Sequence, residues 1–148
     1  MGGKTTFAEM LPLIQEQLEK GGEVTFSPNG SSMLPFIRQG RDEVVIEKFN
    51  GMLKKYDIPF YRRANGQFVL HRVVKIEKDG SYIMRGDHQK ELEKGITNEN
   101  IIGILKCVNR DGKKPILRGT FRYNMWAIFG PWCERTISFL YRIIKHFK

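Results

Sequence analysis

Ser32 and His71 are the residues whose types and settings favour nucleophilic chemistry. Small residues precede Ser32 in the segment Gly30-Ser31-Ser32-Met33-Leu34-Pro35, so the backbone there can approach a bound molecule closely. His71 is one of three histidines, and it lies inside a strand-like run that can aim its side chain. A neutral imidazole, with an ordinary pKa of about 6.5, can accept the proton of a serine hydroxyl near pH 7. The pair predicts acyl transfer through Ser32, and Ser31 is the neighbouring alternative.

Short strands joined by tight turns must position these two residues. The expected strands cover residues 23–26, 43–47, 58–62, 67–77, 81–85, 101–108 and 115–118. The turns between them are marked by Asn50-Gly51, Asn65-Gly66, Asp79-Gly80 and Asp111-Gly112. Because no helix intervenes, the pattern predicts a mainly β fold, in which an antiparallel sheet curls into a barrel-like body.

A helix is expected at each end of this β-rich body. Thr6 and Glu9 form a capping box that opens a short N-terminal helix, kinked at Pro12 and ended by Gly21-Gly22. After Gly130-Pro131, apolar residues recur at helical spacing over residues 131–147. We therefore expect one domain over residues 1–148, with a β-rich catalytic body at 22–118 and a basic amphipathic helical tail at 122–148.

Four short segments, taken in order, resemble the motifs of a known family. They are Ser32-Met33-Leu34-Pro35, Tyr56-Asp57-Ile58-Pro59-Phe60, His71-Arg72-Val73 and Gly86-Asp87. They are similar to the Ser-Met-x-Pro, Gly-Asp-Ile-Val-x-Phe, Lys/His-Arg-Val and Gly-Asp-Asn boxes of type I signal peptidases and their LexA-type autoprotease relatives. The resemblance implies that family's fold and a serine endopeptidase activity, with Ser32 as nucleophile and His71 as base. Histidine at the base position is typical of the endoplasmic-reticulum type.

The chain also departs from the family pattern. Tyr56 replaces glycine, Pro59 replaces valine, and His88-Gln89 stands where the family has asparagine. Gly30 replaces a serine that donates to the oxyanion in some members, so the oxyanion hole is expected to use backbone N–H groups of Ser31, Ser32 and Met33. The family's N-terminal membrane anchor is missing, which argues against a housekeeping signal peptidase.

The acidic partner of His71 depends on the hairpin around Asp79-Gly80. With a three-residue loop, Glu77 faces Ser81 and counting back places His71 opposite Asp87, which we favour as the third catalytic residue. With a two-residue turn, Asp87 instead lies opposite Arg72 and forms an ion pair with it. Glu91 and Glu93, in the acidic stretch that follows, are the substitutes for Asp87.

Composition excludes several classes of protein. There are only two cysteines and they have no CxxC spacing, which argues against a disulfide scaffold and against a structural zinc site. We therefore expect the protein to lie in a reducing compartment. The expected chemistry needs no metal and no organic cofactor. Acidification below the pKa of the histidine is expected to abolish turnover, so the rate should change between pH ~5 and ~8.

Charge and hydropathy indicate where the protein acts. The net charge is +9, and residues 113–148 hold eight basic residues and one acid. This tail favours peripheral contact with an anionic membrane over contact with nucleic acid, and packing of its helix on the β-rich body or on a partner chain is an equal alternative. With no secretory signal and no uncharged run of 18 apolar residues, we expect a cytoplasmic protein at the inner membrane face, acting on a precursor peptide or protein. The alternative function is a non-catalytic binding module of the same fold, whose basic tail contacts nucleic acid or membrane.

Overall fold

The protein is mainly antiparallel β, as the sequence predicts. The computed structural model describes residues 6–129, 142 and 143. Within these residues the strands are β1 (Val24–Phe26), β2 (Asp42–Glu47), β3 (Pro59–Arg62), β4 (Phe68–Leu70), β5 (Arg72–Ile76), β6 (Tyr82–Arg85), β7 (Glu93–Ile96), β8 (Ile101–Arg110) and β9 (Ile116–Leu117). The first helix is α1 (Phe7–Glu19), and a short 3-10 helix, η1 (Asn98–Asn100), precedes β8.

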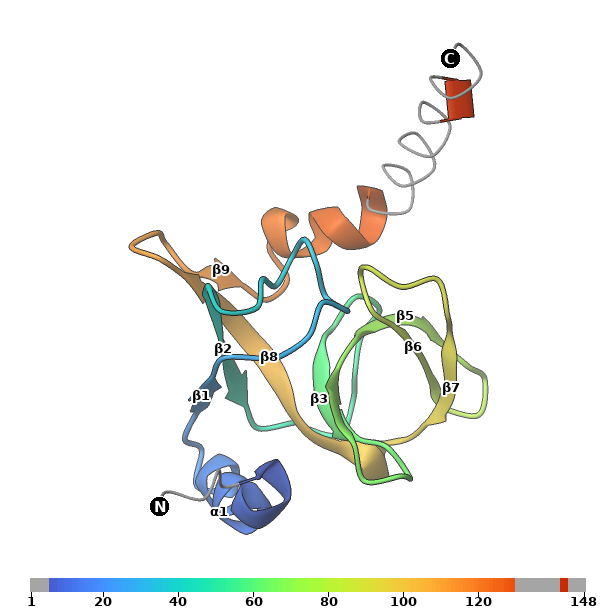
Figure 1. Cartoon of the computed structure of the whole chain (residues 1–148). Helices are drawn as coiled ribbons and strands as arrows, with labels where there is room; N and C mark the ends of the chain where they lie inside the picture. Colours follow the sequence, from blue (N-terminus) through green and yellow to red (C-terminus); the bar gives the residue numbers. More distant parts are fainter. Residues whose placement is uncertain (1–5, 130–141, 144–148) are drawn as a thin grey trace.

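The strands form two sheets that share one curled body. A six-stranded sheet has the order β1-β2-β8-β3-β4, with β9 also paired to β8. A three-stranded sheet has the order β5-β6-β7, and Figure 1 shows its strands and β3 curling around a common centre. One buried cluster packs under α1 against β2 and β8, and a second fills the space between β3 and the smaller sheet. The expected barrel-like curl is present, but it is divided between two sheets.

The N-terminal helix forms for the reason that the sequence indicates. The backbone N–H of Glu9 donates to Thr6 Oγ1 at 3.4 Å, and the Thr6 N–H donates to the Glu9 carboxylate at 3.0 Å. These two bonds complete the predicted capping box and satisfy helix-end donors that have no partner within the helix. Ile14 and Leu18 then bury the apolar face of α1 against the larger sheet.

One predicted strand is wrong in a way that matters for the site. Residues 67–77 were expected to be continuous, but β4 ends at Leu70 and β5 begins at Arg72. The two halves pair in different sheets, β4 with β3 and β5 with β6. His71 lies at the break, so it stands where the two sheets meet. Alternation of side chains alone cannot reveal this break, because it depends on which distant strand each half pairs with.

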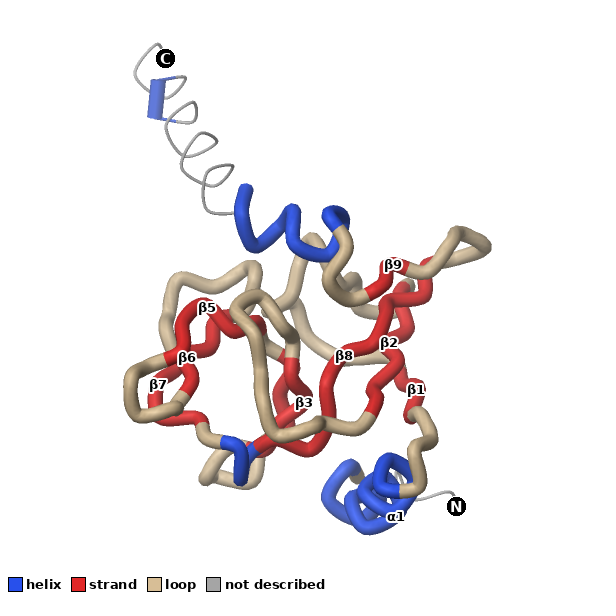
Figure 2. The backbone as a smooth tube through the Cα atoms, turned by 180° about the vertical axis from the view of Figure 1, so that it is seen from behind, coloured by secondary structure: helices blue, strands red, loops and turns tan. Residues whose placement is uncertain are grey.

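A second helix covers residues 121–129, at the start of the tail that the sequence predicts to be helical over 122–148. The expected helix-start signal at Gly130-Pro131 lies outside the described residues. Thr120 Oγ1 accepts from the backbone N–H of Tyr123 at 3.4 Å and caps this helix. Figures 1 and 2 place it at the end of the molecule opposite α1. Of the helix expected over residues 131–147, only 142 and 143 are described, and both are helical; the rest lies outside the described residues.

Candidate functional site

The Ser32 segment runs against the chain that follows β6. The carbonyl oxygen of Ser32 accepts from the backbone N–H of His88 at 2.9 Å. A Cβ atom added to Gly86 would lie 2.5 Å from that same oxygen, so any larger residue would push Ser32 away. Met33 is 5% exposed and anchors the segment in the core, while Ser31 is exposed and Ser32 half-buried. These contacts fix the backbone on both sides of the Ser32 hydroxyl.

His71 belongs to the same region. Arg72 pairs with Arg85 across β5 and β6, so the next position of this antiparallel register places His71 opposite Gly86. Ser32 abuts Gly86 through its carbonyl oxygen. The segments of Ser32 and His71 therefore both adjoin Gly86, although they are distant in sequence. No hydrogen bond joins the Ser32 hydroxyl to His71 within the described part of the chain.

A polar chain of side chains holds His71 on its other side. Tyr61 donates its hydroxyl proton to Glu93 Oε2 at 2.7 Å, and the Tyr61 oxygen lies 3.4 Å from His71 Nδ1. Because the phenol has one proton and gives it to Glu93, its oxygen is available to accept from Nδ1–H. This arrangement favours the neutral tautomer that carries its proton on Nδ1 and leaves the Nε2 lone pair free. A free Nε2 lone pair is what a general base requires.

Glu93 is the acid nearest to His71 and was one of the two substitutes expected from the sequence. Its Oε2 lies 3.7 Å from His71 Nδ1, and both of its oxygens accept from Arg63, at 2.7 and 2.8 Å. The hydrogen bonds from Arg63 and Tyr61 keep the pKa of Glu93 below its ordinary value of 4.5, although burial opposes this shift. Glu93 is therefore ionised and acts on His71 chiefly through Tyr61.

Burial lowers the pKa of His71 from 6.5 to about 4, and the positive charge of Arg63 acts in the same direction. The negative charges of Glu93 and Asp87 oppose the shift without reversing it. The imidazole is only 4% exposed, which explains why desolvation of its charged form dominates. His71 is thus neutral over the whole range in which the sequence alone expected it to titrate.

This shift predicts a pH-dependent loss of stability. As the pH falls below 6.5, the unfolded chain binds a proton at His71 that the folded chain does not bind until about pH 4. The stability contributed by this group is full above pH 6.5 and is lost between 6.5 and 4, by about 3 kcal/mol in total. Asp42 and Glu93, whose pKa values are lowered from 3.8 and 4.5, lose their contributions at lower pH.

Urea unfolding from pH 7 to 4.5 measures this slope, with a His71→Asn variant as the control. The variant keeps a side-chain N–H that can donate to Tyr61 but cannot titrate. Its free energy of unfolding should change much less over this interval. Equal slopes for the two proteins would contradict the lowered pKa of His71.

Asp87 does not take the place beside His71 that the sequence favoured. The predicted three-residue loop is present, since the Glu77 N–H donates to the Ser81 carbonyl at 2.8 Å and Gly80 has φ +85°. A bulge between Val73 and Lys75 then shifts the register by one residue. His71 therefore no longer lies opposite Asp87. Asp87 accepts from Arg72 Nε at 2.8 Å and from Arg72 Nη2 at 2.7 Å, which is the ion pair that the alternative turn had implied, although Arg72 itself lies opposite Arg85.

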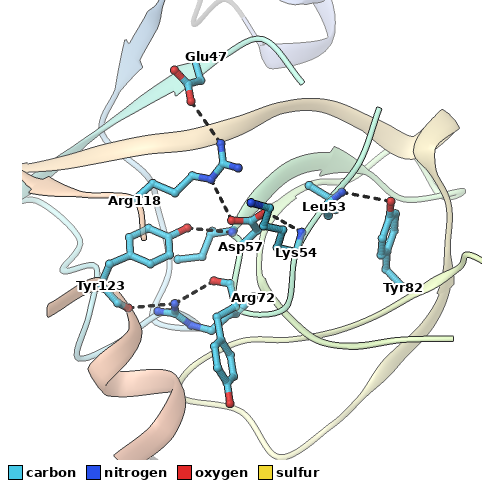
Figure 3. Close-up of polar contacts among 10 residues, drawn as sticks. Glu47, Leu53, Lys54, Asp57, Arg72, Tyr82, Arg118 and Tyr123 are labelled. Atoms are coloured by element: carbon cyan, nitrogen blue, oxygen red, sulfur yellow. Dashed lines mark hydrogen bonds and ion pairs between the residues drawn. The ribbon is translucent and has the colours of Figure 1, made fainter. Parts of the chain in front are cut away.

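Arg72 connects the site to the second helix. Its Nη1 donates to the carbonyl oxygens of Tyr56 and Tyr123, and its guanidinium lies over the rings of Phe36 and Tyr123. Figure 3 shows this guanidinium between Tyr123 and the segment that carries Asp57, ahead of β3. Among the described residues no buried side-chain nitrogen or oxygen lacks a hydrogen-bond partner, so the polar atoms of this buried guanidinium are satisfied.

Asp57, a member of the second motif, has a structural role. Its carboxylate accepts from Arg118 Nε at 2.9 Å and from the backbone N–H of Lys54 at 2.8 Å (Figure 3). Arg118 also reaches Glu47, so this ion network links β2, β3 and the chain after β9. The motif therefore holds the turn before β3 in place.

Tyr61 and Arg63 are the site residues that sequence reasoning missed. Tyr61 pairs with Val69 across the β3–β4 hairpin, and His71 lies two positions beyond Val69. Side chains two positions apart share a face, so the Asn65-Gly66 turn signal could have placed Tyr61 near His71. Arg63 comes near His71 through Glu93 of the distant β7, and β7 was not predicted because Glu93-Lys94-Gly95-Ile96 lacks apolar alternation.

Two hollows flank the site. One of about 30 Å³ beside Ser32 is lined by Pro28, Asn29, Gly30, Ser32, Met33, Ile37 and Leu70. A more open one of about 390 Å³ beside His71 is lined by Arg63, His71, Gln89, Glu91, Leu92 and Glu93. The backbone N–H groups of Ser31, Ser32 and Met33 donate to no group of residues 6–129, whereas the Gly30 N–H donates to Gln39 Oε1 at 3.1 Å. Three backbone donors of the Ser32 segment thus have no partner among the described residues.

The fold and the site together define a mainly antiparallel β protein with a serine and a buried neutral histidine on adjoining segments. Comparisons with protein-family models, with curated proteins and with solved structures give no significant match. Among the described residues, no helix is long and apolar enough to cross a membrane. In the same part of the chain, no three His, Cys, Asp or Glu side chains are grouped so that they could hold a metal ion.

Proposed function

We propose that the protein is a serine endopeptidase of signal-peptidase type, with Ser32 as nucleophile and His71 as general base. The observation that carries the proposal is the meeting of the two motifs at Gly86. The Ser32 carbonyl oxygen abuts Gly86, and His71 lies opposite Gly86 in the register of β5 and β6. The common contact with Gly86 of two motifs that are distant in sequence supports the pairing of Ser32 with His71.

In the proposed mechanism Ser32 Oγ attacks the carbonyl carbon of a peptide bond while His71 Nε2 takes its proton. The oxyanion receives hydrogen bonds from the free N–H groups of the Ser31–Met33 segment. His71 then gives the proton to the leaving amine, and water hydrolyses the acyl-enzyme with His71 again as base. Because serine–base contacts are often loose before substrate binds, the missing Ser32–His71 hydrogen bond is compatible with this mechanism.

The backbone supports the family resemblance at two motif positions. Tyr56 has φ +76°, and the resembled motif has glycine at this position, where a left-handed conformation costs nothing. Gly86 has no room for a Cβ atom, which explains a glycine in the last motif. Both features support the proposal that the chain has the signal-peptidase type of fold, and neither depends on the side chains of the site.

The surroundings of the site favour an extended peptide with small side chains. β4 lies at the edge of the larger sheet and ends directly before His71, whereas the outer edge of β5 is occupied by Tyr56 and Asp57, which exchange backbone hydrogen bonds with Val73. An unpaired strand edge binds a peptide as an additional strand. The hollow beside Ser32 holds only about 30 Å³ and has apolar walls from Met33, Ile37 and Leu70, so it suits a small apolar side chain next to the cleaved bond.

The test is mass spectrometry of a diverse peptide pool after incubation with the wild-type protein, Ser32→Ala and Ser31→Ala. We expect cleavage by the wild-type protein and by Ser31→Ala, and none by Ser32→Ala. Cleavage by the Ser32→Ala variant would overturn the assignment of Ser32 as the nucleophile. To cover a dedicated substrate that the pool lacks, the same three proteins are treated with a fluorophosphonate probe. Failure of the wild-type protein both to cleave and to be labelled at Ser32 would overturn the proposal.

A further inference from the structure

The helix over residues 121–129 is apolar on two opposite faces. Tyr123 is 1% exposed and packs with Trp126 against the core, so one face is covered. On the other face, which we call the outer face, Phe121, Ile128 and Phe129 are 70%, 42% and 48% exposed. Positions 121, 128 and 129 fall on one side of a helix with 3.6 residues per turn, nearly opposite Tyr123. A helix that is apolar on both sides needs a second apolar environment besides the core.

The end of the molecule that carries the outer face is basic. Lys113, Lys114 and Arg122 are exposed, and none of them forms an ion pair with another described residue. Residues 112–129 contain no acid at all. The outer face is therefore an apolar stripe within a segment whose charged residues are all basic.

We propose that the outer face docks on the surface of an anionic lipid bilayer, with the helix lying in the plane of the interface. Aromatic and aliphatic side chains at the acyl boundary, combined with lysine and arginine at the headgroups, are the composition that such helices share. A second copy of the chain is a poorer occupant, since it would bring together two basic ends that contain no acid over residues 112–129, with Arg122 beside both apolar stripes. The charge of this end of the chain thus selects the bilayer.

Docking would also hold the proposed active site close to the lipid surface. Tyr123 packs edge-on against Phe36, with ring centroids 5.4 Å apart, and Phe36 follows Ser32-Met33-Leu34-Pro35 directly. The docking proposal does not require catalysis, so it can be tested on the inactive variant. A membrane surface would then be the place where the substrate is met.

The test is co-sedimentation of the full-length Ser32→Ala protein with vesicles of phosphatidylcholine, alone or mixed with phosphatidylglycerol. We expect binding to the mixed vesicles that weakens as salt is added. Phe121→Ser combined with Phe129→Ser should weaken it by about tenfold or more, because two large apolar side chains no longer leave water. The matched control is Leu13→Ser, which removes a side chain that is 68% exposed on α1, at the opposite end of the molecule.

The design separates this proposal from its rivals. Circular dichroism checks that each variant is folded, and all three replaced side chains are exposed. No binding to the anionic vesicles, or binding that the double variant leaves unchanged, would overturn the proposal. Self-association in the absence of lipid that the same double variant abolishes would also overturn it and assign the outer face to a second copy. Neither result depends on whether Ser32 is a nucleophile.

Discussion

Asp87→Asn is expected to lower the free energy of unfolding by about 3 kcal/mol or more, because it leaves a buried guanidinium without its counter-charge. Arg72 and Asp87 are 1% and 4% exposed in their side chains and are joined by two hydrogen bonds. Removing one member of such a pair costs far more than the pair contributes over an apolar replacement. Arg72 also ties Tyr56 and Tyr123 to β5, so the loss should spread to the second helix. Urea unfolding followed by circular dichroism measures it.

The matched control lies on the neighbouring hairpin. Glu77→Gln removes an ion pair with Lys75 whose side chains are 64% and 36% exposed, and it should cost less than about 1 kcal/mol. Folded Asp87→Asn protein should keep most of its peptide cleavage, because Asp87 is held by Arg72 and not by His71. If Asp87→Asn were as stable as the wild-type protein and lost cleavage, Asp87 would be the catalytic acid that the sequence favoured, and our structural assignment would be wrong.

Local chemistry made part of this fold predictable. The Thr6–Glu9 capping box and the loop closed by Gly80 are determined by residues within a few positions of one another, and both are present. The β-rich class follows from alternation and from the spacing of turn residues. Strand ends differ by one or two residues at β3, β6 and β8. The capping hydroxyl of Thr120 was also a local signal, and it was overlooked in favour of Gly130-Pro131.

Long-range pairing accounts for what could not be predicted. The break at His71 exists because β4 and β5 find partners in different sheets, which no local pattern specifies. The bulge after Val73 moves every earlier residue of β5 by one position along its partner, so His71 lies opposite Gly86 instead of Asp87, and the Asp87 carboxylate pairs with Arg72. Side-chain alternation makes such a slip decisive. Ser32 and His71 were selected by residue type and motif order, whereas their shared environment depends on Tyr61, Arg63 and Glu93.

The same environment changes what pH should do to activity. From the ordinary pKa of histidine, the sequence predicts that cleavage declines between pH ~8 and ~5. Burial lowers the pKa of His71 to about 4, so the imidazole remains an unprotonated base at pH 5. A rate that is constant from pH 8 to 5 is therefore the expected result for this fold. Tyr61 also favours this unprotonated base, because its oxygen accepts from Nδ1–H of His71 and so leaves the Nε2 lone pair available.

His71→Ala is accordingly expected to reduce kcat/KM by about a hundredfold to ten-thousandfold, the usual contribution of a general base. The wild-type profile should bend downward only as the pH approaches about 4, and circular dichroism at each pH separates this bend from acid unfolding. Tyr61→Phe is the comparison for a positioning residue: it removes the oxygen that faces Nδ1 and should cost less than His71→Ala while moving the pH at which the rate bends. A wild-type rate that halves near pH 6.5 would show that His71 is solvated when substrate binds. A rate that His71→Ala leaves unchanged would show that His71 is not the general base. His88, whose backbone N–H donates to the Ser32 carbonyl oxygen, is the other described histidine beside this segment.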